Sequence, residues 1–220
     1  MLKDTSVIIA AGGKGARMGR PKQLLKINGI ETVIRTILAF KKVKRVKEII
    51  VVTTPENFKV VSKKIKCLKF AEAGKERIES VKNGLKEVSN DAVLIAVQDG
   101  ARPLVEPKHI EACLKAAQKD KAAVLGVFVK DTIKVVKDGK VVKTLKRAEL
   151  FAAQTPQCYQ AKILRDALKK YGNKILATDE SQLVEKLGVK VTAVVGDYRN
   201  LKITTPEDLI IASALCKKKK

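Results

Sequence analysis

Short apolar runs alternate with segments of helical period along the whole chain, and this alternation limits the possible folds more than any other feature. The runs are rich in β-branched residues and predict buried strands at 7–10, 49–53, 93–97, 123–129 and 189–195. Between them, apolar residues at helical spacing predict helices at 32–40, 56–66, 77–88, 107–117, 161–170, 179–187 and 206–216. This order is typical of an α/β fold, a mostly parallel twisted sheet with helices on both faces.

One stretch, at about residues 130–146, interrupts the alternation. Two short apolar runs, 133–136 and 141–145, flank Asp138-Gly139, a strong hairpin signal. An isolated hairpin is only marginally stable in water, so we expect it to pack on another body, most simply a second subunit. The sequence shows no linker and no internal repeat. We therefore expect one domain over residues 1–220 that carries a protruding β-hairpin arm.

The net charge of +23 raises the question of nucleic-acid binding. The lysines are spread along the chain, and only the tail 217–220 is a true basic run. Aromatic residues make up 4% of the chain and tryptophan is absent, which leaves few platforms for stacking bases. We therefore expect no specific nucleic-acid partner, although anionic substrates would still be attracted. A basic nucleic-acid-binding protein is kept as the alternative from a different class.

The sequence also limits compartment and chemistry. No stretch approaches the roughly 20 apolar residues of a membrane span, and the N-terminus lacks a signal-peptide core, so we expect no membrane association. The four cysteines are far apart, which argues for the reducing cytoplasm and against structural zinc. His109 is the only histidine, which disfavours a Ser-His-Asp triad or a multi-histidine metal centre.

The most informative motif is the glycine turn, residues 10–23, which follows the first predicted strand. Glycines let backbone N–H groups approach an anion closely, and nearby cations neutralise it. The spacing does not match the dinucleotide fingerprint, because Met18 stands at its third glycine, and it does not match the P-loop. The turn therefore predicts a polyphosphate site of another kind, with glycines at 12, 13 and 15 and cations Lys14, Arg17, Arg20 and Lys22.

Asp99 stands just past the carboxyl end of a predicted strand, where open α/β sheets bind ligands. A carboxylate there suits a Mg²⁺ that holds triphosphate oxygens. Arg102 could bind a phosphate through two nitrogens, or the two residues could simply pair to hold a loop. Asp179-Glu180 begins a predicted helix, where acids favour the dipole, and this reading is as good as a functional one.

Further segments follow the glycine turn in order: 74–81, 98–103, 130–134, Arg147, 155–157, 178–181 and 200–209. The glycine turn resembles the signature of nucleotidyltransferases. Together, the turn and these segments resemble the 2-C-methyl-D-erythritol 4-phosphate cytidylyltransferases (the IspD family) over almost the whole chain. A ribitol 5-phosphate cytidylyltransferase would share the glycine turn and Thr155-Pro156-Gln157, whereas segment 146–150 is more similar to the methylerythritol enzymes.

The resemblance implies a Rossmann-like nucleotidyltransferase fold and a homodimer joined through the arm. It implies that CTP reacts with methylerythritol phosphate to release pyrophosphate, with Mg²⁺, in the non-mevalonate isoprenoid pathway. By position, the implied catalytic residues are Arg17, Lys22, Arg147 and Lys202, and Asp99 is the metal ligand. The implied nucleotide-binding residues are Ala10, Ala11, Gly12, Gly13, Gly15, Gly74, Lys75 and Ser80. The implied acceptor-binding residues are Asp99, Arg102, Thr132, Arg147, Thr155 and Lys202, of which Thr132 and Arg147 would serve the partner subunit's site.

Overall fold

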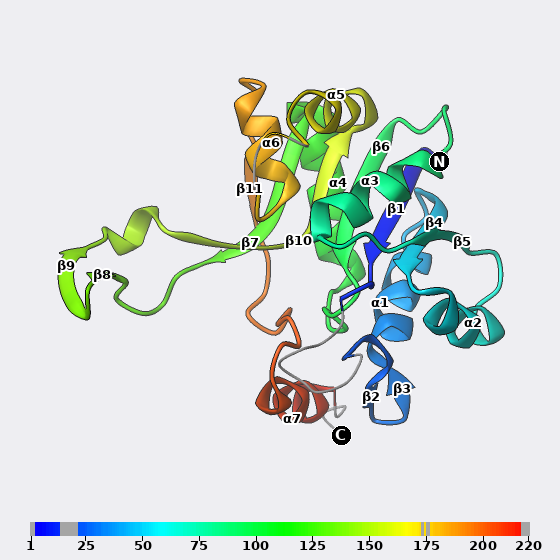
Figure 1. The fold of residues 1–220 in the computed structure, drawn as a ribbon, viewed down its shortest axis with the longest axis horizontal. Helices are drawn as coiled ribbons and strands as arrows, with labels where there is room; N and C mark the ends of the chain where they lie inside the picture. The colour runs from blue at the N-terminus through cyan, green and yellow to red at the C-terminus, as the bar shows by residue number, and fades with distance from the viewer. Residues whose placement is uncertain (1–2, 14–21, 173, 175–176, 217–220) are drawn as a thin grey trace.

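A central sheet organises the fold of the computed structural model, which describes residues 3–13, 22–172, 174 and 177–216. Within this part of the chain, seven strands lie in the order β11-β7-β10-β6-β1-β4-β5 (Figure 1). All pairings are parallel except those of β10 with β6 and β7, so the predicted mostly parallel sheet is confirmed. The strands are β1 Thr5–Ala10, β4 Val46–Thr53, β5 Lys69–Glu72, β6 Leu94–Asp99, β7 Ala122–Phe128, β10 Phe151–Gln160 and β11 Thr192–Val195.

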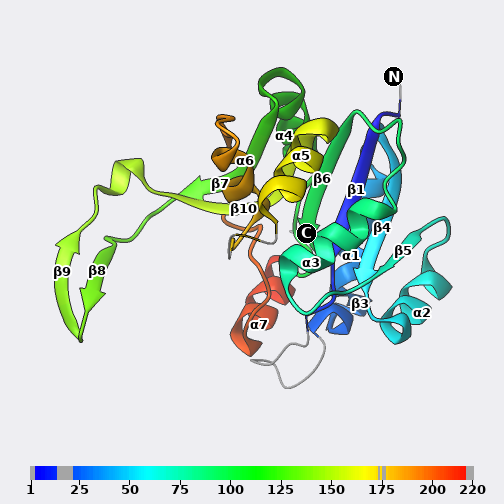
Figure 2. The same ribbon diagram turned by 45° about the horizontal axis from the view of Figure 1, so that its top comes forward.

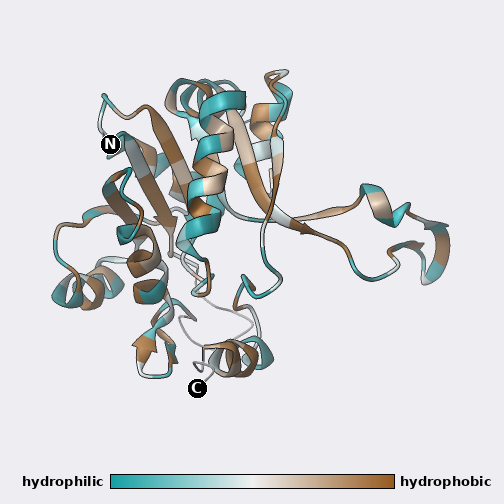
Figure 3. Cartoon of the chain, turned by 180° about the vertical axis from the view of Figure 1, so that it is seen from behind, coloured by the Kyte–Doolittle hydropathy of each residue, from teal (hydrophilic) through white to brown (hydrophobic). Residues whose placement is uncertain are grey.

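Helices cover both faces of this sheet (Figure 2). Successive side chains of a strand point to opposite faces. Val7 and Ile9 therefore pack with one set of helices, whereas Ile8 packs with the other. The central strands are correspondingly apolar (Figure 3). The first set is α1 Thr32–Lys41, α2 Pro55–Lys64 and α4 Pro107–Asp120; the second is α3 Arg77–Lys86, α5 Ala161–Tyr171 and α6 Glu180–Lys186. These helices lie within a few residues of their predicted ranges.

Two strands of the sheet, β5 and β10, were not among those predicted. Proline removes a backbone donor and is disfavoured within a central strand. The polar sequence of β10 contains Pro156, which lies in the gap of the β10–β7 register between Ala153 and Gln157. The last strand, β11, begins at Thr192 and is shorter than the predicted 189–195.

The predicted hairpin is confirmed as an arm that extends away from the sheet (Figure 1). The arm comprises residues 129–150 and contains β8 Lys134–Lys137, β9 Lys140–Thr144 and the short helix η3 Arg147–Glu149. Asp138 and Gly139 have φ angles of 49° and 74°, as the tight turn between two strands requires. Every residue of β8 and β9 is exposed.

The C-terminal helix α7 Pro206–Leu215 packs away from the sheet, against β2 Lys26–Ile27 of the small ribbon that β2 forms with β3 Ile30–Glu31. The segment before α7 is tied to the sheet edge, because the Ile203 N–H donates to the Ala101 carbonyl at 2.8 Å. This bond places the neighbouring Lys202 beside the end of β6. None of the helices in the described ranges is long and apolar enough to cross a membrane.

Candidate active site

A cavity of about 780 Å³ opens at the carboxyl ends of β1 and β6. The chain runs from β1 to β4 and β5 on one side and then returns to β6 on the other side of β1. Open α/β sheets bind ligands at such a reversal of strand order, and the volume is within the range of small-molecule sites. The lining residues are Ala10, Gly12, Gly13, Gln23, Ala73, Gly74, Lys75, Glu76, Arg77, Ser80, Asp99, Ala101 and Lys202.

The first part of the glycine turn forms one wall of the cavity. A side chain on Gly12 would bring its Cβ within 2.0 Å of the Ala73 Cβ, so glycine is needed here for close approach of two segments. The Gln23 amide donates to the Gly13 carbonyl at 2.6 Å and so links the two ends of the turn. Ala11 is buried and does not line the cavity.

Three predicted residues of the turn cannot be placed in full. Gly15 and Arg17 lie outside the described residues. Lys22 is described only by its backbone, as the first residue of the short helix η2 Lys22–Leu24.

The segment that leads into α3 forms the opposite wall. The Ser80 hydroxyl accepts from the Gly74 N–H at 3.0 Å and donates to the Glu76 carbonyl at 3.1 Å. The Glu79 carboxylate accepts from the Lys75 N–H at 2.8 Å. Gly74, Lys75 and Ser80, for which the family resemblance implies nucleotide binding, therefore lie together in a closed turn on the cavity wall.

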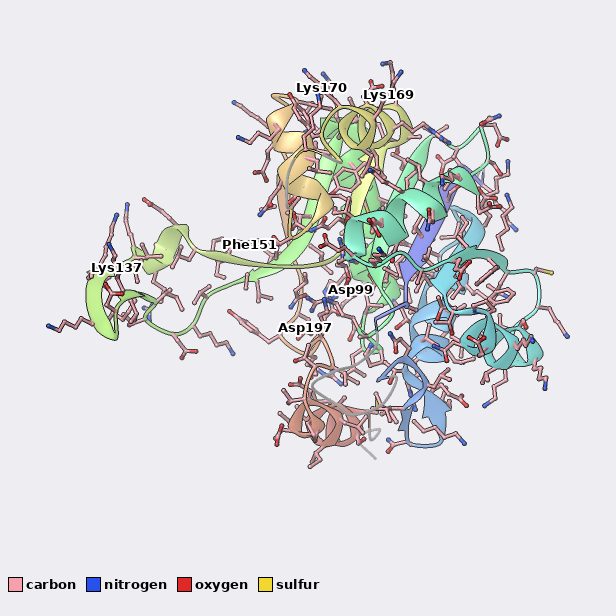
Figure 4. The ribbon with its side chains drawn as sticks, in the orientation of Figure 1. Asp99, Lys137, Phe151, Lys169, Lys170 and Asp197 are labelled. Atoms are coloured by element: carbon pink, nitrogen blue, oxygen red, sulfur yellow. The ribbon has the colours of Figure 1, made fainter. Side chains whose placement is uncertain are left out.

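Asp99, the last residue of β6, is the electrostatic centre of the site (Figure 4). Its Oδ1 lies 3.2 Å from Arg77 Nε, and its Oδ2 lies 2.9 Å from Lys202 Nζ and 3.5 Å from Arg102 Nε. Burial alone would raise the pKa of Asp99, but the charges of Arg77, Lys202 and Arg102 outweigh it and hold that pKa below its ordinary value. Asp99 thus faces three cations, of which Arg77 also pairs with Glu180, and the one positive charge in excess favours an anionic ligand.

Two predicted acceptor-binding residues support this centre from outside the cavity lining. Arg102 is buried, and its Nη1 donates to the Asn200 carbonyl at 2.7 Å. The Thr155 hydroxyl is also buried and accepts from the Asp99 N–H at 3.0 Å. In this structure both residues fix the Asp99 loop, which for Arg102 matches the alternative that it pairs with Asp99 to hold a loop.

The predicted site residues on the arm lie apart from the cavity. Thr132 and Arg147 are exposed, and neither lines the cavity. Arg147 Nη1 donates to the Lys130 carbonyl at 3.1 Å, within the arm itself. Figure 4 shows Lys137 at the far end of the arm and Asp99 in the body of the subunit.

Arg77 belongs to segment 74–81, which carries the family resemblance, but no role in the site was predicted for it. Arg77 lines the cavity, and it contacts both Asp99 and Glu180. A signal was present: Arg77 is the first residue of α3, where the helix dipole disfavours a cation. A cation at that position implies compensation by nearby carboxylates.

The site can supply little of a metal's coordination shell by itself. Across the described ranges, no group of three or more His, Cys, Asp or Glu side chains could hold a metal ion. Mg²⁺ is commonly bound through one or two carboxylates together with substrate phosphates. Asp99 is the one predicted metal ligand, but in this structure its two oxygens face Arg77, Lys202 and Arg102, so its role as a Mg²⁺ ligand stays a prediction.

Comparisons with known proteins point to one family over almost the whole chain. The family model of 2-C-methyl-D-erythritol 4-phosphate cytidylyltransferase matches residues 5–218. The enzyme of that name from Clostridioides difficile is 42% identical over 96% of this chain and 92% of its own. The one from Caldanaerobacter subterraneus is 41% identical over 98% of this chain and 100% of its own.

Solved structures extend the likeness to the fold. The 4-diphosphocytidyl-2C-methyl-D-erythritol synthase of Anaerococcus prevotii aligns with a TM-score of 0.88 at 31% identity, over 98% of this chain and 97% of its own. The cytidylyltransferase of Thermus thermophilus aligns with a TM-score of 0.81 at 30% identity, over 96% and 98% of the two chains. This chain belongs to the 2-C-methyl-D-erythritol 4-phosphate cytidylyltransferase family.

Proposed function

We propose that this protein transfers the cytidylyl group of CTP to 2-C-methyl-D-erythritol 4-phosphate and releases pyrophosphate. The observation that carries the proposal is the cavity in which the glycine turn meets the Asp99–Lys202 centre, in a chain of this family. Both substrates are polyanions, which matches the excess positive charge around Asp99. The scattered cysteines support a cytoplasmic location for the reaction.

The reaction requires positioning and charge stabilisation, with no covalent enzyme intermediate. A phosphate oxygen of the acceptor attacks the α-phosphorus of CTP in line, a new P–O bond forms, and the bond to the pyrophosphate oxygen breaks. Arg17 and Lys22 stabilise the charge that builds on the α-phosphate, while Lys202 holds the acceptor phosphate. Asp99 would be the protein ligand of a Mg²⁺ ion, which would supply neutralising charge to the phosphate oxygens.

The arm extends this proposal to a homodimer. Valines expose large fractions of their surface along the hairpin: 58% for Val136, 61% for Val141 and 59% for Val142. Exposed apolar groups on an isolated hairpin favour a partner. We assign that partner to a second copy of this chain, whose active site then receives Thr132 and Arg147.

The substrate assignment is tested by measuring pyrophosphate release with each nucleoside triphosphate, crossed against methylerythritol phosphate and ribitol 5-phosphate. We expect turnover with CTP and methylerythritol phosphate together. Preferred use of ribitol 5-phosphate would move the protein to the polyol-phosphate enzymes, and turnover only with GTP or UTP would overturn the proposal. RNA binding with steep salt dependence and no pyrophosphate release would favour the nucleic-acid alternative.

The shared site is tested by mixing two inactive variants, Lys22→Ala and Arg147→Ala. In a mixed twofold dimer, one site combines an intact glycine turn with an intact arm of the other subunit. Random exchange should therefore restore about a quarter of the wild-type activity. Absence of recovery, when subunit exchange is demonstrated with tagged copies, would show that each arm serves its own subunit.

A further inference from the structure

A buried carboxylate lies behind the cavity wall and has no role in the mechanism above. Glu180, the first residue of α6, is fully buried and does not line the cavity. Its Oε1 accepts from Arg77 Nη1 at 2.5 Å, and its Oε2 has no hydrogen-bond partner in the described part of the chain. Burial raises the pKa of Glu180, and the charge of Arg77 opposes that rise. A buried ion pair of this kind is weak evidence for stability, so another role has to be considered.

The start of α6 does not require this glutamate. Asp179 already caps the helix, because its side chain accepts from the Gln182 N–H at 3.2 Å. An acid at a helix start favours the dipole while it stays near the end of the helix axis. The Glu180 carboxylate instead pairs with Arg77 of another helix, so capping does not explain it.

Arg77 connects Glu180 with the reacting end of the site. Its Nη1 contacts Glu180 and its Nε contacts Asp99 Oδ1, so the two carboxylates share one guanidinium. The second oxygen of Asp99 then faces the Lys202 ammonium at 2.9 Å, with Arg102 Nε farther away at 3.5 Å. Charges alternate in sign from α6 to the cavity, in the order Glu180, Arg77, Asp99, Lys202.

We propose that Glu180 is a positioning residue for the transfer reaction, and that it acts through Arg77 on the Asp99–Lys202 pair. A free guanidinium can bind a carboxylate through two nitrogens at once. Because Glu180 holds Nη1, Arg77 meets Asp99 through Nε, and Asp99 keeps Oδ2 for Lys202. A lysine side chain has many rotamers, so this anchor fixes the ammonium where the acceptor phosphate binds. The inference rests on the proposed function.

The test compares Glu180→Gln with wild type and with the matched control Glu185→Gln, which neutralises an exposed acid on the same helix. Glutamine keeps the volume and the acceptor oxygen at position 180 but removes the charge that holds Arg77. We expect the KM for methylerythritol phosphate to rise about 10-fold, the size of a coupling between contacting charges, while the KM for CTP changes less than about twofold. Glu185→Gln should match wild type.

A double-mutant cycle shows whether the effect passes through Arg77. If it does, Glu180→Gln combined with Arg77→Gln should cost no more than Arg77→Gln alone. Three results would each overturn the inference. They are losses that multiply in the double variant, an unchanged KM for methylerythritol phosphate in Glu180→Gln, and equal rises of both KM values together with a lowered Tm. If Glu180→Gln does not fold, Glu180→Asp is measured instead, because aspartate keeps the charge. We expect this variant to fold with a near-normal KM for methylerythritol phosphate. A failure to fold or a raised KM would also overturn the inference. A wild-type protein without turnover would instead contradict the proposed function.

Discussion

Two lysine–carboxylate pairs lie at opposite ends of the central sheet and look alike in isolation. Lys202 lies 2.9 Å from Asp99 at the carboxyl end of β6, and Lys69 lies 2.6 Å from Glu48 near the start of β4. The lysine side chains are 37% and 46% exposed, and the carboxylates are 9% and 10% exposed. Distance and burial therefore do not separate the pair that belongs to the site from the pair that belongs to the fold.

The other partners of each carboxylate distinguish the two lysine–carboxylate pairs. Glu48 also accepts from the Ser6 hydroxyl and from the N–H and hydroxyl of Ser89, which are neutral donors. Asp99 instead meets the further cations Arg77 and Arg102. One cluster is balanced and satisfied internally, while the other retains positive charge toward a cavity. The charge balance of a cluster, more than any single ion pair, therefore distinguishes the functional end of this sheet from the other end.

The largest effect is expected from Asp99→Asn. It leaves two mostly buried arginines, Arg77 and Arg102, without their shared counter-ion. Loss of one member of a buried charge cluster costs about 3–5 kcal/mol of unfolding free energy. Urea unfolding and steady-state kinetics should show loss of both stability and turnover. A variant with wild-type stability would mean that the arginines do not depend on Asp99.

A smaller effect is expected from Glu48→Gln at the other end of the sheet. Its hydrogen bonds to Ser6, Ser89 and Lys69 lose their ionic character, which should cost about 1–3 kcal/mol of unfolding free energy. Below its Tm, the variant should retain wild-type kcat/KM, because none of these groups lines the cavity. A changed KM for either substrate would show that the Glu48 cluster also contributes to the active site.

The pH dependence of stability tests whether Glu48 stabilises the fold in its charged form. Burial would raise the pKa of Glu48, but the hydrogen bonds from Lys69, Ser6 and Ser89 lower it from 4.5 to about 2. A carboxylate with a lowered pKa stabilises the fold above its ordinary pKa, and this contribution is lost as the pH falls toward the folded-state value. The stability difference between wild type and Glu48→Gln should therefore be constant above pH 4.5 and shrink as the pH falls toward about 2. A difference that grows on acidification would contradict this assignment.

The smallest effect concerns a surface pair that belongs to neither cluster. Lys162 and Asp166 are 84% and 46% exposed on α5. Lys162→Ala should change the unfolding free energy by less than about 1 kcal/mol and leave turnover unchanged. Thermal unfolding of this variant sets the background against which the other substitutions are judged.

The fold was predictable where local pattern and tertiary structure agree. The β-branched runs and helical periods located α1 to α7, and Asp138-Gly139 located the arm. β10 could not be located in this way, because its pairing with β6 and β7 comes from distant segments, and Pro156 argues against a strand. For β5, four residues with a single buried position offer too little pattern.

The site was predictable where a motif carries its chemistry along the chain. Gly12 and Asp99 were predicted from the chemistry of their motifs, Gly74 and Lys202 from the family resemblance, and the structure brings all four to one cavity. Arg77 at the start of a helix called for a nearby carboxylate, but Glu180 lies 103 positions away and no local pattern identifies it as the partner. Whether Arg17, Lys22, Thr132 and Arg147 act at this cavity stays a prediction.

A parallel assay of Lys202→Ala and Lys69→Ala tests most directly whether the Asp99 cluster serves the active site while the Glu48 cluster serves only the fold. Each substitution removes a half-exposed lysine from a buried carboxylate, so the two are matched in chemistry and burial. For Lys202→Ala we expect kcat/KM for methylerythritol phosphate to fall about 100-fold or more, the scale of a lost charge-stabilising donor. Lys69→Ala should keep kcat/KM within about twofold of wild type but lose about 1–3 kcal/mol of unfolding free energy, because the mostly buried Glu48 loses its counter-ion. Equal losses of kcat/KM in the two variants would contradict the account.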